Sequence, residues 1–255
     1  MNIITNIPAF RSFFRVMLPV VLALAPVFSL SGCRAHRNTL LNPSLLDLRA
    51  LPLPPARLKV AELVRERLEA GDVQDIAVYF HALPTGYWFG INEEAKFIPA
   101  SLLKIYLMMG ILKEAQTNPG LLREEVLIQK PETFKEYPFP PSFDSNNPPV
   151  VGKEYTVEEL VSRMMVFSDN LSLFYLSLHL PEDLLGKTMS DFGLASPEDV
   201  NQDFVSVKQQ MMAMLALYNS TYLSPEMSQK ALGYLAMASY DSGLAAGLPR
   251  GVKEA

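Results

Sequence analysis

Several stretches of the chain carry apolar residues at the spacing of one helix face. Residues 56–71 (ARLKVAELVRERLEAG) alternate apolar and charged positions in this way, which predicts a helix that Gly71 ends. Residues 75–83 (DIAVYFHAL) are instead β-branched and aromatic, and the same character returns in YWFGIN after the turn sequence PTG. This second pattern predicts a β-hairpin.

The rest of the chain is mainly helical by the same criterion. Helices are expected over four segments: from near Ser101 to about Gln116, and over residues 156–168, 206–220 and 224–239. Thr156 and Glu159 form a capping box, in which each side chain bonds the backbone N–H of the other residue. This box predicts the start of the helix over residues 156–168.

Proline-rich segments separate some of these elements. Residues 34–55 are expected to be a linker, because the prolines near their end favour an extended backbone. Residues 131–149 hold six prolines and are expected to be irregular. The sequence GKT at residues 186–188 is expected to be a loop after a helix. It is not a P-loop, because the first glycine that this motif requires is Pro181 here.

The first 33 residues have the pattern of an export leader. Arg11 and Arg15 precede an uncharged apolar run, residues 16–30, which is too short and too interrupted by proline for a comfortable membrane-spanning helix. Small residues then precede Cys33 in LSGC, which resembles a bacterial lipobox. We expect Cys33 to be lipidated and to anchor an exported domain on a membrane, facing the periplasm or the cell exterior. An ordinary signal peptide and an uncleaved anchor are the alternatives.

Composition narrows the classes of function. The chain has 255 residues, 49% of them hydrophobic, which is enough for one sizeable domain or two small ones. Its net charge is −5, so the chain lacks the excess of basic residues that is typical of nucleic-acid-binding proteins. A single cysteine excludes an internal disulfide. His36, His81 and His179 are scattered, with no H-E-x-x-H motif and no close acid partner, so we expect no metal, no cofactor and no Ser-His-Asp triad.

One lysine stands in the apolar stretch FIPASLLKIYLMMGIL, residues 97–112. Residues three apart share a helix face, so Ser101 and Lys104 are expected to project together. A serine hydroxyl becomes a nucleophile when a base takes its proton, and a desolvated lysine can be that base. The simpler interpretation is a capping serine beside a lysine that extends to water. The apolar residues around Lys104 leave little polar face, which favours a buried central helix instead.

A second polar motif, the S-D-N of Ser168, Asp169 and Asn170, lies within another apolar stretch. S-x-x-K followed 67 residues later by S-D-N resembles the class A β-lactamases and the related penicillin-binding proteins, whose signature also includes K-T-G. The resemblance covers roughly residues 56–255. It implies an α+β fold of the β-lactamase/DD-peptidase-like type, with a helical part and an antiparallel hairpin.

The resemblance also implies a role for each motif residue. Ser101 would attack a β-lactam or peptide carbonyl and form an acyl-enzyme, and Lys104 would help to deprotonate it. The backbone N–H of Ser101 would supply half of the oxyanion hole. Ser168 would pass a proton to the leaving nitrogen. Asn170 would hydrogen bond the substrate amide and orient Lys104, whereas Asp169 would be structural and bond the local backbone.

The chain departs from the family pattern in two places. K-T-G is absent, and residues 245–255 resemble the stretch just ahead of that motif. We therefore expect residues 56–255 to be an incomplete domain without the C-terminal strands and the last helix, which would leave the hairpin with exposed edges. The family's E-x-x-L-N glutamate, which activates the deacylating water, has no match, because Glu198 and Asn201 are one residue too close. Without it an acyl-enzyme would persist.

Three functions remain open on these grounds. The first is an exported serine hydrolase that opens β-lactam rings through an acyl-enzyme on Ser101. The second is a DD-peptidase-like, penicillin-binding or slow serine hydrolase that acts on D-Ala-D-Ala-like cell-wall peptides. The third is a lipoprotein whose incomplete domain only binds or is inactive. We expect a monomer with no nucleic-acid partner.

Overall fold

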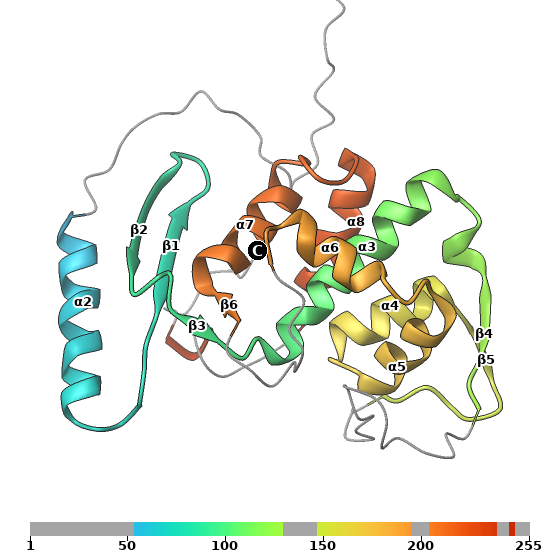
Figure 1. Cartoon of the computed structure of the whole chain (residues 1–255), viewed down its shortest axis with the longest axis horizontal. Coiled ribbons are helices and arrows are strands. Elements are labelled where there is room, and N and C mark those ends of the chain that lie inside the picture. Colours follow the sequence, from blue (N-terminus) through green and yellow to red (C-terminus); the bar gives the residue numbers. More distant parts are fainter. Residues whose placement is uncertain (1–53, 130–146, 195–203, 239–244, 248–255) are drawn as a thin grey trace, which may run out of the picture. The chain divides into compact units, whose positions relative to one another are not determined.

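The computed structural model describes residues 54–129, 147–194, 204–238 and 245–247. In these ranges helices predominate, and three short two-stranded antiparallel sheets accompany them (Figure 1). The predicted leader with Cys33, most of the predicted linker, and the pair Glu198 and Asn201 lie outside the described residues. None of the described helices has the length and apolar character needed to cross a bilayer.

The predicted hairpin is confirmed. Strand β1 (Val78–Ala82) pairs antiparallel with β2 (Tyr87–Ile91), in a register that places Phe80 opposite Phe89. The two rings stack with their centroids 5.3 Å apart, an aromatic cross-strand pair of the kind that stabilises a hairpin. Two helices contact the hairpin: α2 (Pro54–Glu69) contacts β2, and α7 (Val207–Tyr218) contacts β1.

The remaining sheets join segments that are far apart in the sequence. Strand β3 (Lys96–Phe97) pairs with β6 (Val205–Ser206), which lies directly before α7. Strand β4 (Glu125–Leu127) pairs with β5 (Glu154–Thr156). Three short 3₁₀ helices complete the described elements: η1 (Ala100–Leu102), η2 (Leu121–Arg123) and η3 (Ala245–Gly247).

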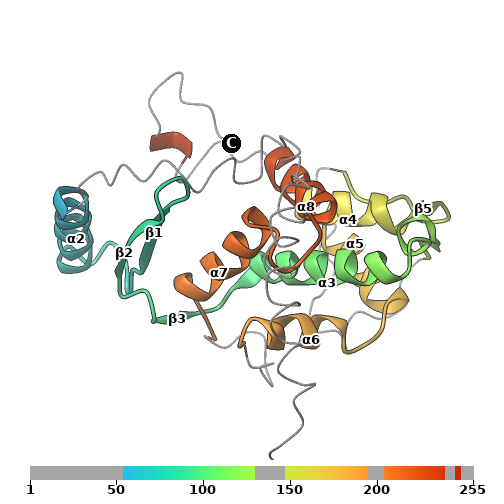
Figure 2. The same ribbon diagram turned by 90° about the horizontal axis from the view of Figure 1, so that it is seen from above.

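Helix α3 (Leu103–Thr117) is the centre of the described core. Eleven of its fifteen residues are buried, Lys104 among them, which confirms the predicted buried central helix. Figures 1 and 2 show the helices that surround it. Those in contact with α3 are α4 (Val157–Val166), α6 (Leu184–Asp191) and α8 (Pro225–Met237).

Helices α4 and α5 (Asn170–His179) pack against each other, and the S-D-N motif lies where the chain enters α5. The predicted capping box at the start of α4 is confirmed. Glu159 N donates to Thr156 Oγ1 at 3.1 Å, and Thr156 N donates to Glu159 Oε2 at 2.8 Å. The box fixes where α4 begins, and the helix ends at Val166, two residues before Ser168.

The expectation of a loop over residues 186–188 is wrong, because these residues lie inside α6. Leu184, Thr188 and Met189 are buried, at the spacing of one helix face, whereas Gly186 is only half-buried. Packing of this face against α3 outweighs the poor helix propensity of glycine. Helix α2 likewise begins at Pro54, inside the predicted linker, because a helix tolerates proline in its first turn.

Candidate active site

Ser101 lies in the 3₁₀ turn η1, directly before α3, and its side chain is exposed. The preceding residue, Ala100, has φ +46°, and Ser168 has φ +53°. Left-handed backbone is costly for residues other than glycine and is often found at functional sites. The strained backbone therefore lies at Ser168 itself and at the residue directly before Ser101.

Three side chains from the two motifs meet at this point. Lys104 Nζ donates to Ser168 Oγ at 3.0 Å, and Ser168 Oγ donates to Ser101 Oγ at 3.1 Å. Lys104 Nζ also donates to the carbonyl oxygen of Ser168 at 2.6 Å. Among the described residues, Ser101 and Lys104 are thus joined through Ser168 and not by a direct hydrogen bond. The spacing of S-x-x-K does not reveal this arrangement.

Lys104 is almost completely buried, with 4% of its surface exposed. Burial disfavours the charged ammonium and lowers the pKa of Lys104 to about 8, while the negative charge of Asp169 acts in the opposite direction. A lysine with this pKa is neutral in a useful fraction of molecules near neutral pH. It can therefore accept a proton, which an ordinary surface lysine rarely does.

The other two positions of the S-D-N motif begin α5. Asp169 caps this helix, and its Oδ1 accepts from Ser172 N at 2.5 Å, which is the local backbone bond expected for it. Asn170 is the first residue of α5 and is half-buried. Ser101 and Ser168 are both exposed, so a substrate can reach the two hydroxyl groups from solvent.

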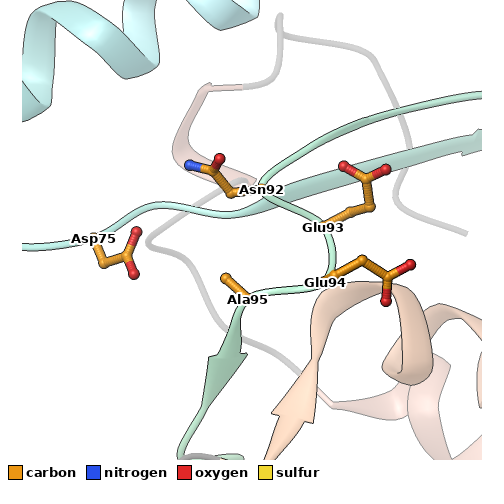
Figure 3. A pocket seen from close by; sticks show the side chains of 5 residues that line it. All are labelled: Asp75, Asn92, Glu93, Glu94 and Ala95. Carbon is orange, nitrogen blue, oxygen red and sulfur yellow. The ribbon is translucent and has the colours of Figure 1, made fainter.

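An open acidic hollow of about 480 Å³ lies at another place in the described structure. Figure 3 shows the residues that line it: Asp75, Asn92, Glu93, Glu94 and Ala95. Two of these side chains already have partners within the chain, since Glu94 pairs with Lys208 and Asn92 Nδ2 donates to the Ile76 carbonyl at 3.0 Å. None of the predicted site residues lines this hollow.

The expectation that no acid lies close to a histidine is wrong for His179. Its Nε2 is 2.9 Å from Glu124 Oε2, although the two residues are 55 positions apart in the sequence. The pair joins the end of α5 to the residue before β4, and Ser101 hydrogen bonds Ser168 instead, so the pair forms no triad with it. Within the ranges that the structure describes, no group of three or more His, Cys, Asp or Glu residues could hold a metal ion.

The fold of the described residues is similar to that of solved β-lactamases and a penicillin-binding protein. A mutant of PBP-A, in an acyl-enzyme complex with penicillin G, is 18% identical, with 75% of each chain covered and a TM-score of 0.57. A class A β-lactamase from Mycobacterium abscessus is 20% identical, with 74% of this chain and 75% of that chain covered and a TM-score of 0.61. A β-lactamase from Xanthomonas campestris is 19% identical, covers 75% and 76% of the two chains, and has a TM-score of 0.60.

These likenesses confirm the predicted α+β fold of the β-lactamase/DD-peptidase-like type. A sequence search of curated proteins finds no match. The profile of the Beta-lactamase enzyme family, by contrast, matches residues 59–255, which is most of the chain and nearly the whole range of the motif resemblance. The match confirms that resemblance: the chain belongs to the β-lactamase enzyme family.

Proposed function

We propose that this member of a hydrolase family opens β-lactam rings through an acyl-enzyme on Ser101. The observation that supports this most is the hydrogen-bonded path from Lys104 through Ser168 to Ser101. A nucleophile, an exposed relay hydroxyl and a buried base with a lowered pKa are the parts that acyl transfer needs. The structurally similar PBP-A mutant forms an acyl-enzyme with penicillin G, which favours the same class of substrate.

In the proposed reaction the path carries a proton in both directions. Neutral Lys104 takes the proton of the Ser168 hydroxyl while Ser168 takes that of Ser101. Ser101 Oγ then bonds to the lactam carbonyl carbon, and the negative charge develops on the carbonyl oxygen next to the Ser101 N–H. When the C–N bond of the ring breaks, the proton returns from Lys104 through Ser168 to the leaving nitrogen. Asn170 is assigned to the substrate amide.

A second candidate is a penicillin-binding or DD-peptidase-like enzyme that acts on D-Ala-D-Ala-like peptides. The observation that favours it is the missing E-x-x-L-N pattern, since Glu198 and Asn201 are one residue too close. A glutamate in that pattern activates the water that releases the acyl group. Without an equivalent base, the acyl-enzyme on Ser101 would be hydrolysed slowly.

Turnover of a chromogenic cephalosporin separates these functions. Continuous hydrolysis supports a β-lactamase, whereas a single absorbance step equal to the enzyme concentration supports a penicillin-binding enzyme. Either signal should disappear in Ser101→Ala and persist in Ser177→Ala, a matched control whose hydroxyl bonds the Leu173 carbonyl within α5. A folded protein that opens no lactam would contradict both candidates and leave the third, a lipoprotein that only binds or is inactive.

The cellular setting forms a separate part of the proposal. The order of Arg11, Arg15, the apolar run of residues 16–30 and Cys33 supports export, followed by lipid attachment to Cys33. An acyl-modified Cys33 would hold a monomeric domain at the membrane surface, on the side of the periplasm or the cell exterior. Enzymes that act on cell-wall peptides or on incoming β-lactams work in the same location.

A further inference from the structure

Phe167 is a half-exposed aromatic residue directly before Ser168 in the chain. It keeps 42% of its surface exposed, although phenylalanine is among the residues most often buried in folded proteins. Phe80 is similarly exposed but stacks on Phe89, whereas no ring among the described residues stacks on Phe167. A single exposed apolar residue is ordinary on a protein surface, so its position decides whether it has a function.

The position of Phe167 is fixed by the end of α4. Phe167 caps this helix, and its N–H donates to the Arg163 carbonyl at 3.1 Å. The same carbonyl accepts from Asp169 N at 3.4 Å, so one acceptor holds the backbone on both sides of Ser168. Consecutive Cα atoms are about 3.8 Å apart, and both Phe167 and Ser168 are exposed. Phe167 therefore presents apolar surface to solvent directly next to the relay hydroxyl.

The proposed reaction places a substrate over the two serines in one orientation. Ser101 Oγ bonds to the carbonyl carbon, and Ser168 Oγ passes the proton to the leaving nitrogen. The C–N bond that breaks must therefore span the two hydroxyl groups, whose oxygens are 3.1 Å apart. The acyl side of the substrate then extends from Ser101, and the amine side extends from Ser168, where Phe167 is the neighbouring exposed side chain.

We propose that Phe167 is a specificity-determining residue of this site: its ring packs against the amine side of the substrate and favours apolar, above all aromatic, groups there. The assignment rests on the proposed function and adds a substrate preference to it. In a cephalosporin the amine side is the ring that contains the lactam nitrogen's second carbon substituent, together with the group attached to that ring. In a peptide it is the leaving residue.

The contact with Phe167 should affect the acylation step. Covering the exposed part of the ring removes apolar surface from water on both partners, and a second ring adds the preference of aromatic groups for each other. The contact forms before the C–N bond breaks, so it contributes to the rate constant for acylation of Ser101. A polar or small group at the same place gains little, because it leaves the ring of Phe167 exposed.

The test compares two cephalosporins that share their acylamino side chain and carry either a styryl or a methyl group on the nitrogen-side ring. The measured quantity is the second-order acylation rate constant of the full chain, taken as kcat/KM for turnover or from adduct formation if the acyl-enzyme persists. Phe167→Ala should lower this constant roughly tenfold for the styryl compound and change it little for the methyl compound. Phe167→Tyr keeps a ring and should retain the wild-type preference.

Two controls separate this preference from a general effect. Leu178→Ala removes a similarly exposed apolar side chain about 12 Å along α5 from Asn170, and it should leave both rate constants unchanged. Two cephalosporins that differ only in the acylamino group test the acyl side, where wild type and Phe167→Ala should show the same preference.

The outcomes distinguish this inference from the proposed function. If Phe167→Ala keeps the wild-type preference for the styryl compound, or loses a preference for the acylamino group instead, the assignment of Phe167 is wrong while acylation of Ser101 stands. A folded wild type that neither compound acylates would refute the proposed function, and the assignment with it.

Discussion

The hydroxyl of Ser168 is within hydrogen-bond distance of both the candidate nucleophile and the candidate base. The sequence predicted that Ser101 and Lys104 lie close together, because residues three apart share a helix face. It did not predict that Ser168 stands between them, since its contacts join residues 64 and 67 positions apart. The positive φ of Ala100 also has no signal in the sequence, because alanine rarely adopts this conformation.

The acylation of Ser101 should depend on pH through Lys104. The base must be neutral, and the pKa of Lys104 is about 8, so the acylation rate should rise with pH and reach half of its plateau near that value. At pH 7 about a tenth of the lysine is neutral, which makes acylation roughly tenfold slower than the plateau. Stopped-flow acylation rates from pH 6 to 10 provide the measurement. A rate that is constant from pH 6 to 9 would exclude Lys104 as the base.

The lowered pKa of Lys104 should also make the folding stability depend on pH. Its pKa falls from 10.5 to about 8 on folding, so between these values the unfolded chain binds more protons than the folded chain. The contribution of Lys104 to folding stability therefore increases as the pH rises from about 8 to 10.5. The unfolding free energy of the wild type, relative to Lys104→Met, should increase by up to about 1.4 kcal/mol per pH unit there. Urea unfolding at pH 7 and pH 9.5 measures this, and an unchanged difference would contradict a buried, readily deprotonated lysine.

At the scale of elements, the sequence patterns predicted most of what the structure describes. The hairpin, α2, α3, α4, α7 and α8 were expected from periodicity and capping signals, all of which are local in sequence. Helix α6 was missed over residues 186–188 because Gly186 weakens the local signal, whereas the packing that stabilises the helix comes from α3. The contact between His179 Nε2 and Glu124 Oε2 was missed for a related reason, because it joins distant segments.

The contact between α3 and α6 depends on the absence of a side chain at Gly110. A Cβ there would overlap Thr188 Oγ1 and lie 3.2 Å from Leu184 Cγ. Gly110→Ala should therefore destabilise the fold by about 1–3 kcal/mol, although alanine is the better helix former. Thermal and urea unfolding measure the loss. In the background of Thr188→Ala the same substitution should cost much less, and an equal cost in both backgrounds would rule out this contact as the cause.

At the scale of the whole molecule, the two motifs and their order were sufficient to identify the family. The family profile matches residues 59–255, and the motif resemblance covers roughly residues 56–255. The lipidated leader stays a prediction, because residues 1–53 lie outside the described structure. The absence of a deacylating glutamate also stays a prediction, since Glu198 and Asn201 lie outside the described residues as well.

Lipid attachment can be measured on the whole chain in a bacterial host. Wild-type protein should incorporate labelled palmitate and remain with the membrane fraction, because a diacylated cysteine anchors a soluble domain stably. Cys33→Ala should abolish the label and release the protein or leave an unprocessed precursor. Incorporation of label into Cys33→Ala would show that Cys33 is not the modified residue, and an unlabelled wild type would favour an ordinary signal peptide.

The central claim is that Ser101 forms a covalent bond with an opened β-lactam. Incubation with penicillin G, followed by acid quenching and peptide mass spectrometry, locates any adduct directly. The account predicts one penicilloyl group per chain, on the peptide that contains Ser101, and no adduct in Ser101→Ala. Labelling that survives in Ser101→Ala, or a folded wild-type protein that acquires no adduct at any quench time, would contradict it.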